Sequence, residues 1–257
     1  MTPCVLITGA SFGTGYAIAE RFAKEGYAVF IGGRGKEYGE DVDAAAKQLQ
    51  EAYGCFAKGV LYHTDCICEQ EINALFEQIK AEGYPLKACV FNAAHLGRGQ
   101  ESLSVKFDDF MQVIQTNVGF NFLIAQHAAR QMKQNGGGSL VFIGSNSALR
   151  VTENRCAYCS SKSAMLAMSK SFAVDWGQYG IRSNVILPGM IKTKRWQENE
   201  NGIQNLLANK TPIGDIAEFE DIANAAWFLC SEQARCITGT ELTVDGGMLA
   251  QLTPKAE

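Results

Sequence analysis

The stretch Cys4-Val5-Leu6-Ile7-Thr8-Gly9-Ala10-Ser11-Phe12-Gly13-Thr14-Gly15 joins a short apolar run to a loop that contains three glycines. The apolar run is typical of a buried strand, and residues 16–24 have the spacing of an amphipathic helix. Glycines between a strand and a helix let the backbone approach a phosphate group closely, and the helix N-terminus adds free N–H donors. A tight turn without a ligand is the alternative, but the position of these glycines favours a phosphate-binding loop.

Apolar runs and helical patterns alternate along the rest of the chain. Strands are predicted over residues 4–8, 27–32, 59–64, 87–92, 139–144, 182–187 and 241–244, and helices over residues 16–24, 41–52, 69–81, 107–134, 158–179 and 219–231. Strands without polar alternation are buried on both faces, as in a parallel sheet covered by helices. Repeated βα units with right-handed crossovers give a doubly wound sheet. With no linker or internal repeat, residues 1–257 are predicted to form a single α/β domain with a Rossmann-like, doubly wound parallel sheet.

Composition excludes several classes of function. The 257 residues carry a net charge of −4, which provides no basic patch for nucleic acid. No apolar run approaches the ~18 residues of a membrane span. The first residues lack the basic region of a signal peptide, and the chain has nine cysteines, so we expect a cytoplasmic protein with reduced thiols.

Two cysteine spacings raise the question of a metal or redox site. Cys156 and Cys159 form a C-x-x-C motif, but the other close pair, Cys66 and Cys68, has only one intervening residue. A structural zinc site usually needs a second pair of similar spacing, and the three histidines are scattered. We therefore expect no metal site and cysteines that pack as small hydrophobic groups.

Tyr158 and Lys162 stand four residues apart, so their side chains share one face of a helix. A phenol titrates near pH 10, and a neighbouring ammonium favours the phenolate and lowers that pKa. The pair can thus act as a general acid and base near neutral pH. Tyr-x-x-x-Lys alone also occurs by chance, so its value depends on the surrounding motifs.

Thr8-Gly9-x-x-x-Gly13-x-Gly15, Asn117, Ser145 and Tyr158-x-x-x-Lys162, in this order, resemble the short-chain dehydrogenase/reductase family. The resemblance extends over residues 5–247. It also includes residues that follow later strands, namely Asp65, Asn92-Ala93, Pro188-Gly189 and Asp245-Gly246-Gly247. Departures from the family pattern are Phe91 and Ala94 beside Asn92-Ala93, and Phe12 and Thr14 in the glycine loop; none of them removes a catalytic group.

The resemblance implies hydride transfer between a nicotinamide dinucleotide and a carbonyl or secondary alcohol. Tyr158 would be the acid and base. Lys162 would lower the pKa of the phenol and hold the nicotinamide ribose. Ser145 would donate a hydrogen bond to the substrate oxygen. Asn117 would anchor a water that links Lys162 to solvent.

The implied cofactor contacts come from the loops that follow the strands and from the Tyr158 helix. They are Gly9, Ser11, Phe12, Gly13, Thr14, Gly15, Arg34, Asp65, Cys66, Asn92, Ala93, Tyr158, Lys162, Pro188, Gly189, Ile191 and Thr193.

The end of the second strand bears on which dinucleotide is used. An acid there favours NAD, whereas this chain has Gly33 at that position and Arg34 after it. The planar guanidinium of Arg34 suits a phosphate dianion, and Ser11 adds a hydroxyl donor. The sequence thus favours NADP(H); the alternative is that Arg34 stacks on adenine or faces solvent.

Substrate contacts are expected from residues 94–100, 146–155 and 190–215, and the last of these is expected to be a lid. Their side chains mix apolar groups with cations, which suits a hydrophobic ketone with an acidic tail, such as a bile-acid-like steroid or an acyl thioester. The basic residues are Arg98, Arg150, Arg155, Lys192, Lys194 and Arg195. The alternative is that these cations are solvated surface.

The favoured function is reduction or oxidation of a small hydrophobic ketone or alcohol, of hydroxysteroid type. A 3-oxoacyl-[acyl-carrier-protein] reductase is the main alternative, although the resemblance implies docking arginines near the active-site mouth where this chain has Gly136 and Tyr179. A sugar or polyol dehydrogenase and a non-catalytic dinucleotide-binding protein remain open. The family pattern also implies a homotetramer, and residues 107–134 and 158–179 carry apolar side chains on more than one helix face.

Overall fold

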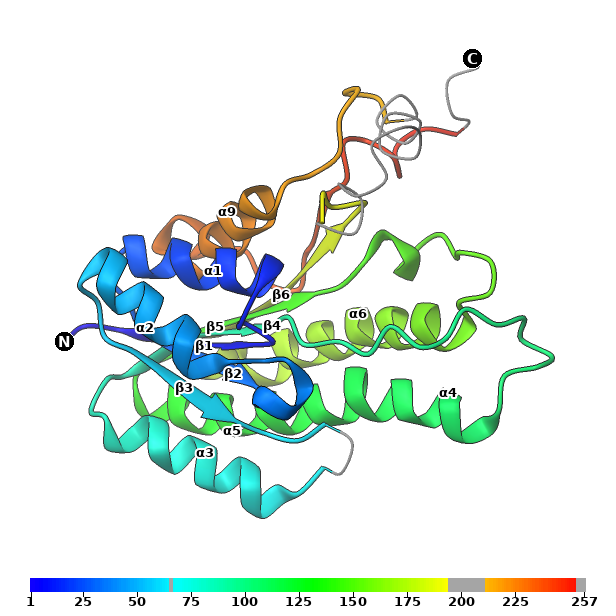
Figure 1. The fold of residues 1–257 in the computed structure, drawn as a ribbon. Coiled ribbons are helices and arrows are strands. Elements are labelled where there is room, and N and C mark those ends of the chain that lie inside the picture. Colours follow the sequence, from blue (N-terminus) through cyan, green and yellow to red (C-terminus); the bar gives the residue numbers. More distant parts are fainter. Residues whose placement is uncertain (65–66, 194–210, 253–257) are drawn as a thin grey trace.

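The computed structural model describes residues 1–64, 67–193 and 211–252. Seven parallel strands form one sheet in the order β3-β2-β1-β4-β5-β6-β7 (Figure 1). The strands are β1 Cys4–Thr8, β2 Ala28–Gly33, β3 Ala57–Leu61, β4 Leu86–Phe91, β5 Gly138–Ile143, β6 Ile181–Pro188 and β7 Glu241–Val244. This order confirms the predicted doubly wound parallel sheet.

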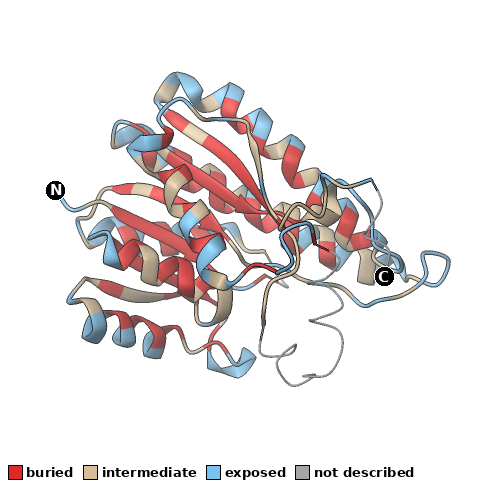
Figure 2. Ribbon diagram, turned by 90° about the horizontal axis from the view of Figure 1, so that it is seen from above, coloured by how far each residue is buried: buried red, intermediate tan, exposed pale blue. Residues whose placement is uncertain are grey.

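Helices cover both faces of the sheet. They are α1 Gly13–Lys24, α2 Val42–Tyr53, α3 Glu69–Ala81, α4 Phe107–Ile114, α5 Asn121–Gln134, α6 Cys156–Trp176 and α9 Phe219–Cys230. Alternate residues of β1 belong to different cores: Val5 and Ile7 pack with α1, α2 and α9, whereas Leu6 packs with α3, α5 and α6. Figure 2 shows the buried strands between helices whose outer faces are exposed.

Several element boundaries differ by a few residues from the sequence prediction, and two differences are larger. The third strand ends at Leu61 rather than at residue 64, because it pairs only with β2, which ends opposite it at Gly33. The helix predicted over residues 107–134 contains a π-helical segment, Gln115–Phe120, between α4 and α5. In this wider turn the Asn121 Nδ2 donates to the Asn117 carbonyl oxygen at 2.8 Å, so a side-chain amide satisfies a backbone acceptor.

The strand order reverses between β1 and β4, since the chain continues from β1 to β2 on one side and from β3 back to β4 on the other. In open α/β sheets this switch point creates a crevice outside the carboxyl ends of the strands. The glycine loop follows β1, and residues 92–97 follow β4, so both reach this crevice.

The described cysteines are all free thiols, and four of them, Cys4, Cys89, Cys159 and Cys230, are buried. Within the described ranges, no helix combines the length and hydrophobicity required to cross a membrane.

Candidate active site

Hydrogen bonds connect the glycine loop after β1 to Tyr62 and to the loop after β4. The Gly9 N–H donates to the Tyr62 hydroxyl at 2.7 Å, and the Asn92 Nδ2 donates to the Gly9 carbonyl at 2.7 Å. The Thr8 hydroxyl accepts hydrogen bonds from the N–H groups of Asn92 and Ala93, both at 3.1 Å. Gly9 has a φ of +63°, and a Cβ there would lie only 2.9 Å from the Ala93 Cα. Glycine is therefore required where the loops after β1 and β4 meet.

The start of α1 has free donors that fit a phosphate group. Phe12 precedes the helix with no side-chain cap, and its ring is exposed. The Ser11 hydroxyl oxygen is buried without a hydrogen-bond partner within the described residues. A Cβ at Gly15 would overlap the Gly9 carbonyl oxygen, so glycine is needed there too. An orphaned hydroxyl beside uncapped helix N–H groups is the kind of donor set that a dinucleotide pyrophosphate requires.

Arg34, at the end of β2, is held by an acid that sequence reasoning did not identify. Its Nε and Nη2 donate to the Glu40 Oε1 at 2.9 Å and 2.8 Å, and its backbone N–H donates to the Glu40 Oε2 at 2.7 Å. The guanidinium carbon lies 4.7 Å from the centre of the Tyr38 ring. Glu40 is buried. Arg34 thus follows β2 as expected, but its guanidinium is half of an ion pair.

Ser145, Tyr158 and Lys162 meet at the carboxyl end of β5. Ser145 follows that strand, and its buried hydroxyl accepts from the Ser147 N–H at 3.1 Å. Tyr158 and Lys162 lie in the first turns of α6, with the Lys162 Nζ 5.6 Å from the centre of the phenol ring. The Lys162 Nζ donates to the Ile143 carbonyl at 2.6 Å.

Burial dominates the ionisation of this pair. It raises the pKa of Tyr158, while a hydrogen bond with Ser145 and the positive charge of Arg155 act in the opposite direction. Burial also lowers the pKa of Lys162 from 10.5 to about 8. That Lys162 lowers the pKa of the phenol stays a prediction. Lys162 is itself desolvated and donates to a backbone carbonyl.

Asn117 lies in the π-helical segment and is completely buried. Its Oδ1 accepts from the His95 N–H at 2.7 Å, and its Nδ2 donates to the His95 carbonyl and the Ser161 hydroxyl, both at 2.9 Å. The Ser161 hydroxyl donates to the Tyr158 carbonyl at 2.7 Å. Asn117 therefore connects the loop after β4 to the Tyr158 helix. Ser161 and Asn121 extend this network, and no motif in the sequence had pointed to them.

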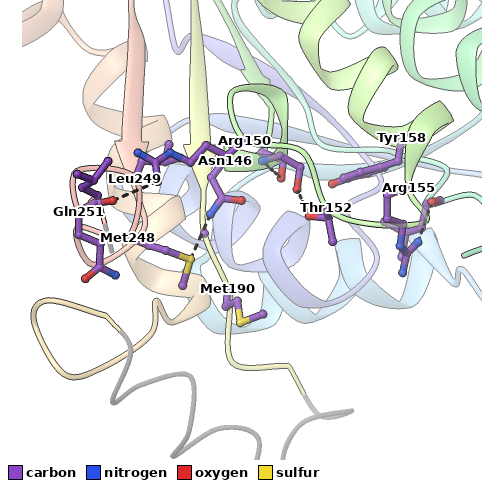
Figure 3. A pocket seen from close by; sticks show the side chains of 14 residues that line it. Asn146, Arg150, Thr152, Arg155, Tyr158, Met190, Met248, Leu249 and Gln251 are labelled. Atoms are coloured by element: carbon purple, nitrogen blue, oxygen red, sulfur yellow. Dashed lines mark hydrogen bonds between the residues drawn. The ribbon is translucent and has the colours of Figure 1, made fainter. Parts of the chain in front are cut away.

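A cavity of about 450 Å³ opens beside Tyr158 (Figure 3). Its walls come from the loops that follow β4, β5, β6 and β7. The lining residues are Leu96, Ser145, Asn146, Ser147, Arg150, Thr152, Arg155, Tyr158, Gly189, Met190, Met248, Leu249, Gln251 and Leu252. Figure 3 shows the phenol ring of Tyr158 extending towards the interior of this cavity.

Comparison with known proteins identifies the family. A family model described as "Enoyl-(Acyl carrier protein) reductase" matches residues 9–249. The chain is 33% identical to the 7alpha-hydroxysteroid dehydrogenase of Escherichia coli K12 over 251 residues, which covers 97% of this chain and 95% of that protein. It belongs to the short-chain dehydrogenase/reductase family.

Two further relatives illustrate the range of this family. The L-rhamnose 1-dehydrogenase (NAD(P)(+)) of Azotobacter vinelandii is 30% identical over 251 residues, covering 96% of this chain and 97% of that protein. A crystal structure of gluconate 5-dehydrogenase from Burkholderia cenocepacia, in complex with NADP and tartrate, superimposes with a TM-score of 0.87 at 25% identity. The match covers 97% of this chain and 96% of that one.

The structure describes the cofactor residues that the family resemblance implies after β6, including the first residues of the predicted lid up to Thr193. The Gly189 N–H donates to the Val244 carbonyl at 2.9 Å, directly after Pro188 ends β6. Ile191 forms an isolated parallel bridge with Ala217, and Thr193 is half-buried. Residues 194–210 of the predicted lid lie outside the described residues, as do the predicted cofactor residues Asp65 and Cys66.

Gly136 and Tyr179 lie far from the mouth of this cavity. Gly136 precedes β5 and Tyr179 precedes β6, so both are at the amino-terminal edge of the sheet, whereas the cavity is at the carboxyl edge. The sequence comparison with acyl-carrier-protein reductases had placed these positions near the active-site mouth. Within one chain they lie at the edge of the sheet opposite this cavity.

Proposed function

We propose that this protein is an NADP(H)-dependent oxidoreductase that interconverts a ketone and a secondary alcohol on a small, largely hydrophobic substrate of hydroxysteroid type. The observation that carries the proposal is the presence of Ser145 and Tyr158 together in the wall of a cavity of about 450 Å³ that also has five apolar side chains. They are Leu96, Met190, Met248, Leu249 and Leu252. A ketone placed against these hydroxyls leaves its carbon skeleton on apolar surface.

Each catalytic role follows from the position of a side chain. Tyr158 donates a proton to the carbonyl oxygen during reduction and accepts the alcohol proton during oxidation. Ser145 donates a hydrogen bond to the same oxygen as negative charge develops. Lys162, buried behind the phenol, receives or returns the proton. Asn117 positions the Tyr158 helix, and its carbonyl has a second lone pair available for a water.

The dinucleotide supplies or accepts the hydride when it is bound. Its pyrophosphate would lie on the glycine loop, with Ser11 and the uncapped start of α1 as donors. Asn92 and Ala93 would contact the adenosine ribose through the backbone. Arg34 would receive the 2′-phosphate, and the NADP in the gluconate 5-dehydrogenase structure supports this choice by analogy. Ile191 and Thr193 would meet the nicotinamide carboxamide.

We also propose that residues 1–257 act as one domain in the cytoplasm and that four copies assemble, as the family resemblance implies. A 3-oxoacyl-[acyl-carrier-protein] reductase is a second candidate, because the description of the matching family model names an acyl-carrier-protein substrate. A sugar or polyol dehydrogenase is a third, supported by the polar cavity residues Asn146, Ser147 and Thr152 and by the L-rhamnose dehydrogenase relative. A non-catalytic dinucleotide-binding protein would not need the complete set of Ser145, Tyr158 and Lys162.

A substrate screen tests these candidates. Purified protein with NADPH or NADH is mixed in turn with a ketosteroid, a ketosugar and an acetoacetyl thioester, and consumption of the dinucleotide is followed by absorbance. We expect the ketosteroid to be reduced with the highest kcat/KM. Preference for the thioester or the ketosugar would replace the proposal by the corresponding candidate, and no turnover with any class would support the non-catalytic alternative.

A further inference from the structure

Two arginines from one loop line the candidate substrate cavity. Arg150 follows the short 3-10 turn after β5, and Arg155 directly precedes α6. All the residues that line this cavity lie in the described part of the chain, and none of them is an aspartate or a glutamate. The cavity wall therefore carries two positive charges and no compensating negative one.

Both guanidinium groups keep most of their hydrogen-bonding capacity free. The Arg150 Nη1 donates to the Gln251 carbonyl at 3.1 Å, and the Arg155 Nη1 donates to the Leu96 carbonyl at 3.1 Å. A guanidinium has five N–H donors, and these single bonds to neutral carbonyls orient each group without neutralising it. Across the described ranges, neither arginine forms an ion pair with a carboxylate.

Three other cations of this protein have their charge paired or their donors occupied. Arg34 is paired with Glu40, and Lys192, at the base of the predicted lid, is paired with both Asp215 and Glu218. Arg182 donates from both Nη atoms to the backbone carbonyls of Leu229, Ser231 and Ile237. Lys192 is already neutralised by its neighbours and is not expected to recruit an anion. Arg150 and Arg155 combine a free charge, spare donors and a position in the cavity wall.

We propose that Arg150 and Arg155 form an anion subsite, so that the substrate carries a carboxylate or phosphate group away from its reacting carbon. The planar fork of arginine binds either group through paired N–H donors. This inference rests on the proposed function, because it assumes that Ser145 and Tyr158 hold the reacting oxygen in the same cavity. It identifies the substrate class as an anionic ketone or hydroxy acid with an apolar body.

The two arginines have separable roles. Arg155 is close enough to Tyr158 for its charge to favour the phenolate, whereas Arg150 is attached to the C-terminal segment through Gln251. Replacing Arg155 thus changes both the anion subsite and the ionisation of Tyr158. Replacing Arg150 changes the anion subsite alone, which makes Arg150→Gln the decisive variant.

Matched pairs of ligands test the proposal. The probes are dehydrocholate with its methyl ester and 5-oxohexanoate with its methyl ester; each ester lacks the negative charge and carries one additional methyl group. Inorganic phosphate at constant ionic strength tests for a phosphate subsite. Dissociation constants are measured by calorimetry on the complex with NADP⁺, which cannot reduce a ketone, and kcat/KM is measured separately with NADPH by dinucleotide absorbance. The proteins are wild type, Arg150→Gln, Arg150→Lys, Arg155→Gln and the distant exposed control Arg235→Gln.

We expect wild type to bind each acid more tightly than its ester. Arg150→Gln and Arg155→Gln should each weaken binding of the acid by about 10-fold to 100-fold, the loss expected for a hydrogen bond to a charged group, and leave the ester unchanged. Arg150→Lys should retain part of the preference, and Arg235→Gln should behave as wild type. Thermal unfolding without ligand verifies that each variant is folded.

Equal affinity for acid and ester in wild type, or equal loss of both in Arg150→Gln, would overturn the anion subsite. Failure of the wild-type complex to bind the acids or inorganic phosphate would overturn it as well. Measurements of turnover separate the test of the anion subsite from the test of the proposed function. Arginine-dependent binding of the acids without any reduction would support the anion subsite and count against the proposed function. Equal reduction of acid and ester would support the proposed function and count against the anion subsite.

Discussion

The Glu40 carboxylate binds Arg34 through three hydrogen bonds, two from the guanidinium and one from the backbone N–H. Arg34 is the residue that favours NADP(H) in the sequence, and Glu40 is six positions further along. A 2′-phosphate would have to share the guanidinium with this carboxylate. Like charges at this distance repel each other, so we expect Glu40 to limit the preference for NADP(H) over NAD(H).

Replacing Glu40 by Gln is expected to raise the preference for NADPH. The amide keeps an acceptor for Arg34 but removes the negative charge, and the ratio of kcat/KM for NADPH to that for NADH should rise roughly fivefold. Arg34→Ala should lower the same ratio. The affinities of both dinucleotides, measured by fluorescence without substrate, provide an independent readout. Glu37→Gln, on the same turn, is the control, and an unchanged ratio in Glu40→Gln would mean that the 2′-position is recognised elsewhere.

Gly33→Asp is not expected to convert the protein to NADH use in a simple way. A Cβ at Gly33 would lie 2.5 Å from the Val42 Cγ1 and 3.0 Å from the Glu40 Oε2. The new carboxylate would also be placed beside Glu40. We therefore expect a lower thermal unfolding temperature for this variant, and a stable variant with a clean change in cofactor use would contradict the geometry described for β2.

Tyr158→Phe should abolish turnover without loss of NADPH binding. The variant loses the transferable proton and keeps the ring, so kcat should fall by at least about 10²–10⁴-fold. NADPH titration followed by fluorescence should give a dissociation constant close to that of wild type. Retention of more than about a tenth of wild-type kcat would remove Tyr158 from the role of acid and base.

The activity should depend on pH through Tyr158. Reduction requires the protonated phenol, and burial keeps its pKa above the ordinary value of 10.0, so reduction should persist across the neutral range. Oxidation requires the phenolate and should increase as pH rises. Arg155→Gln removes a charge that lowers the pKa of Tyr158, so the rise in oxidation should move to higher pH. Arg150→Gln should leave the profile in place, and an equal shift in both variants would argue against a specific effect of Arg155.

Lys162 should produce a pH-dependent cost to stability. Its pKa is about 8 in the folded protein and 10.5 ordinarily, so between these values the unfolded chain binds more protons. Burial of the Lys162 charge therefore lowers the free energy of unfolding most below about pH 8. The free energy of unfolding of wild type rises as the pH increases through that window. The difference in unfolding temperature between Lys162→Met and wild type should be largest below that pH and narrow above it. A constant difference would show that the pKa of Lys162 is the same in the folded and unfolded protein.

Much of the fold and of the site could be predicted from the sequence, because the relevant signals are local. The glycine loop, Ser145 and the Tyr158 helix each follow a recognisable strand, and parallel strands bring their carboxyl ends to one edge. The π-helical segment was missed because residues 107–134 keep a helical period throughout. Glu40 was missed because its approach to Arg34 depends on a turn in which Gly39 has a φ of +74°. Burial, which governs the pKa of Lys162, becomes visible only when the layers are assembled.

The hydrogen bonds from Asn146 to Met248 and from Arg150 to Gln251 join the loop after β5 to the segment after β7. Neither segment contributes to the network of Thr8, Gly9 and Asn92 that shapes the glycine loop. Mutations can therefore accumulate in the substrate wall while the dinucleotide crevice stays intact. Substitutions in these two segments are therefore expected to change which alcohol or ketone is accepted without altering the dinucleotide crevice, and directed evolution of this oxidoreductase should target residues 146–155 and 248–252 first.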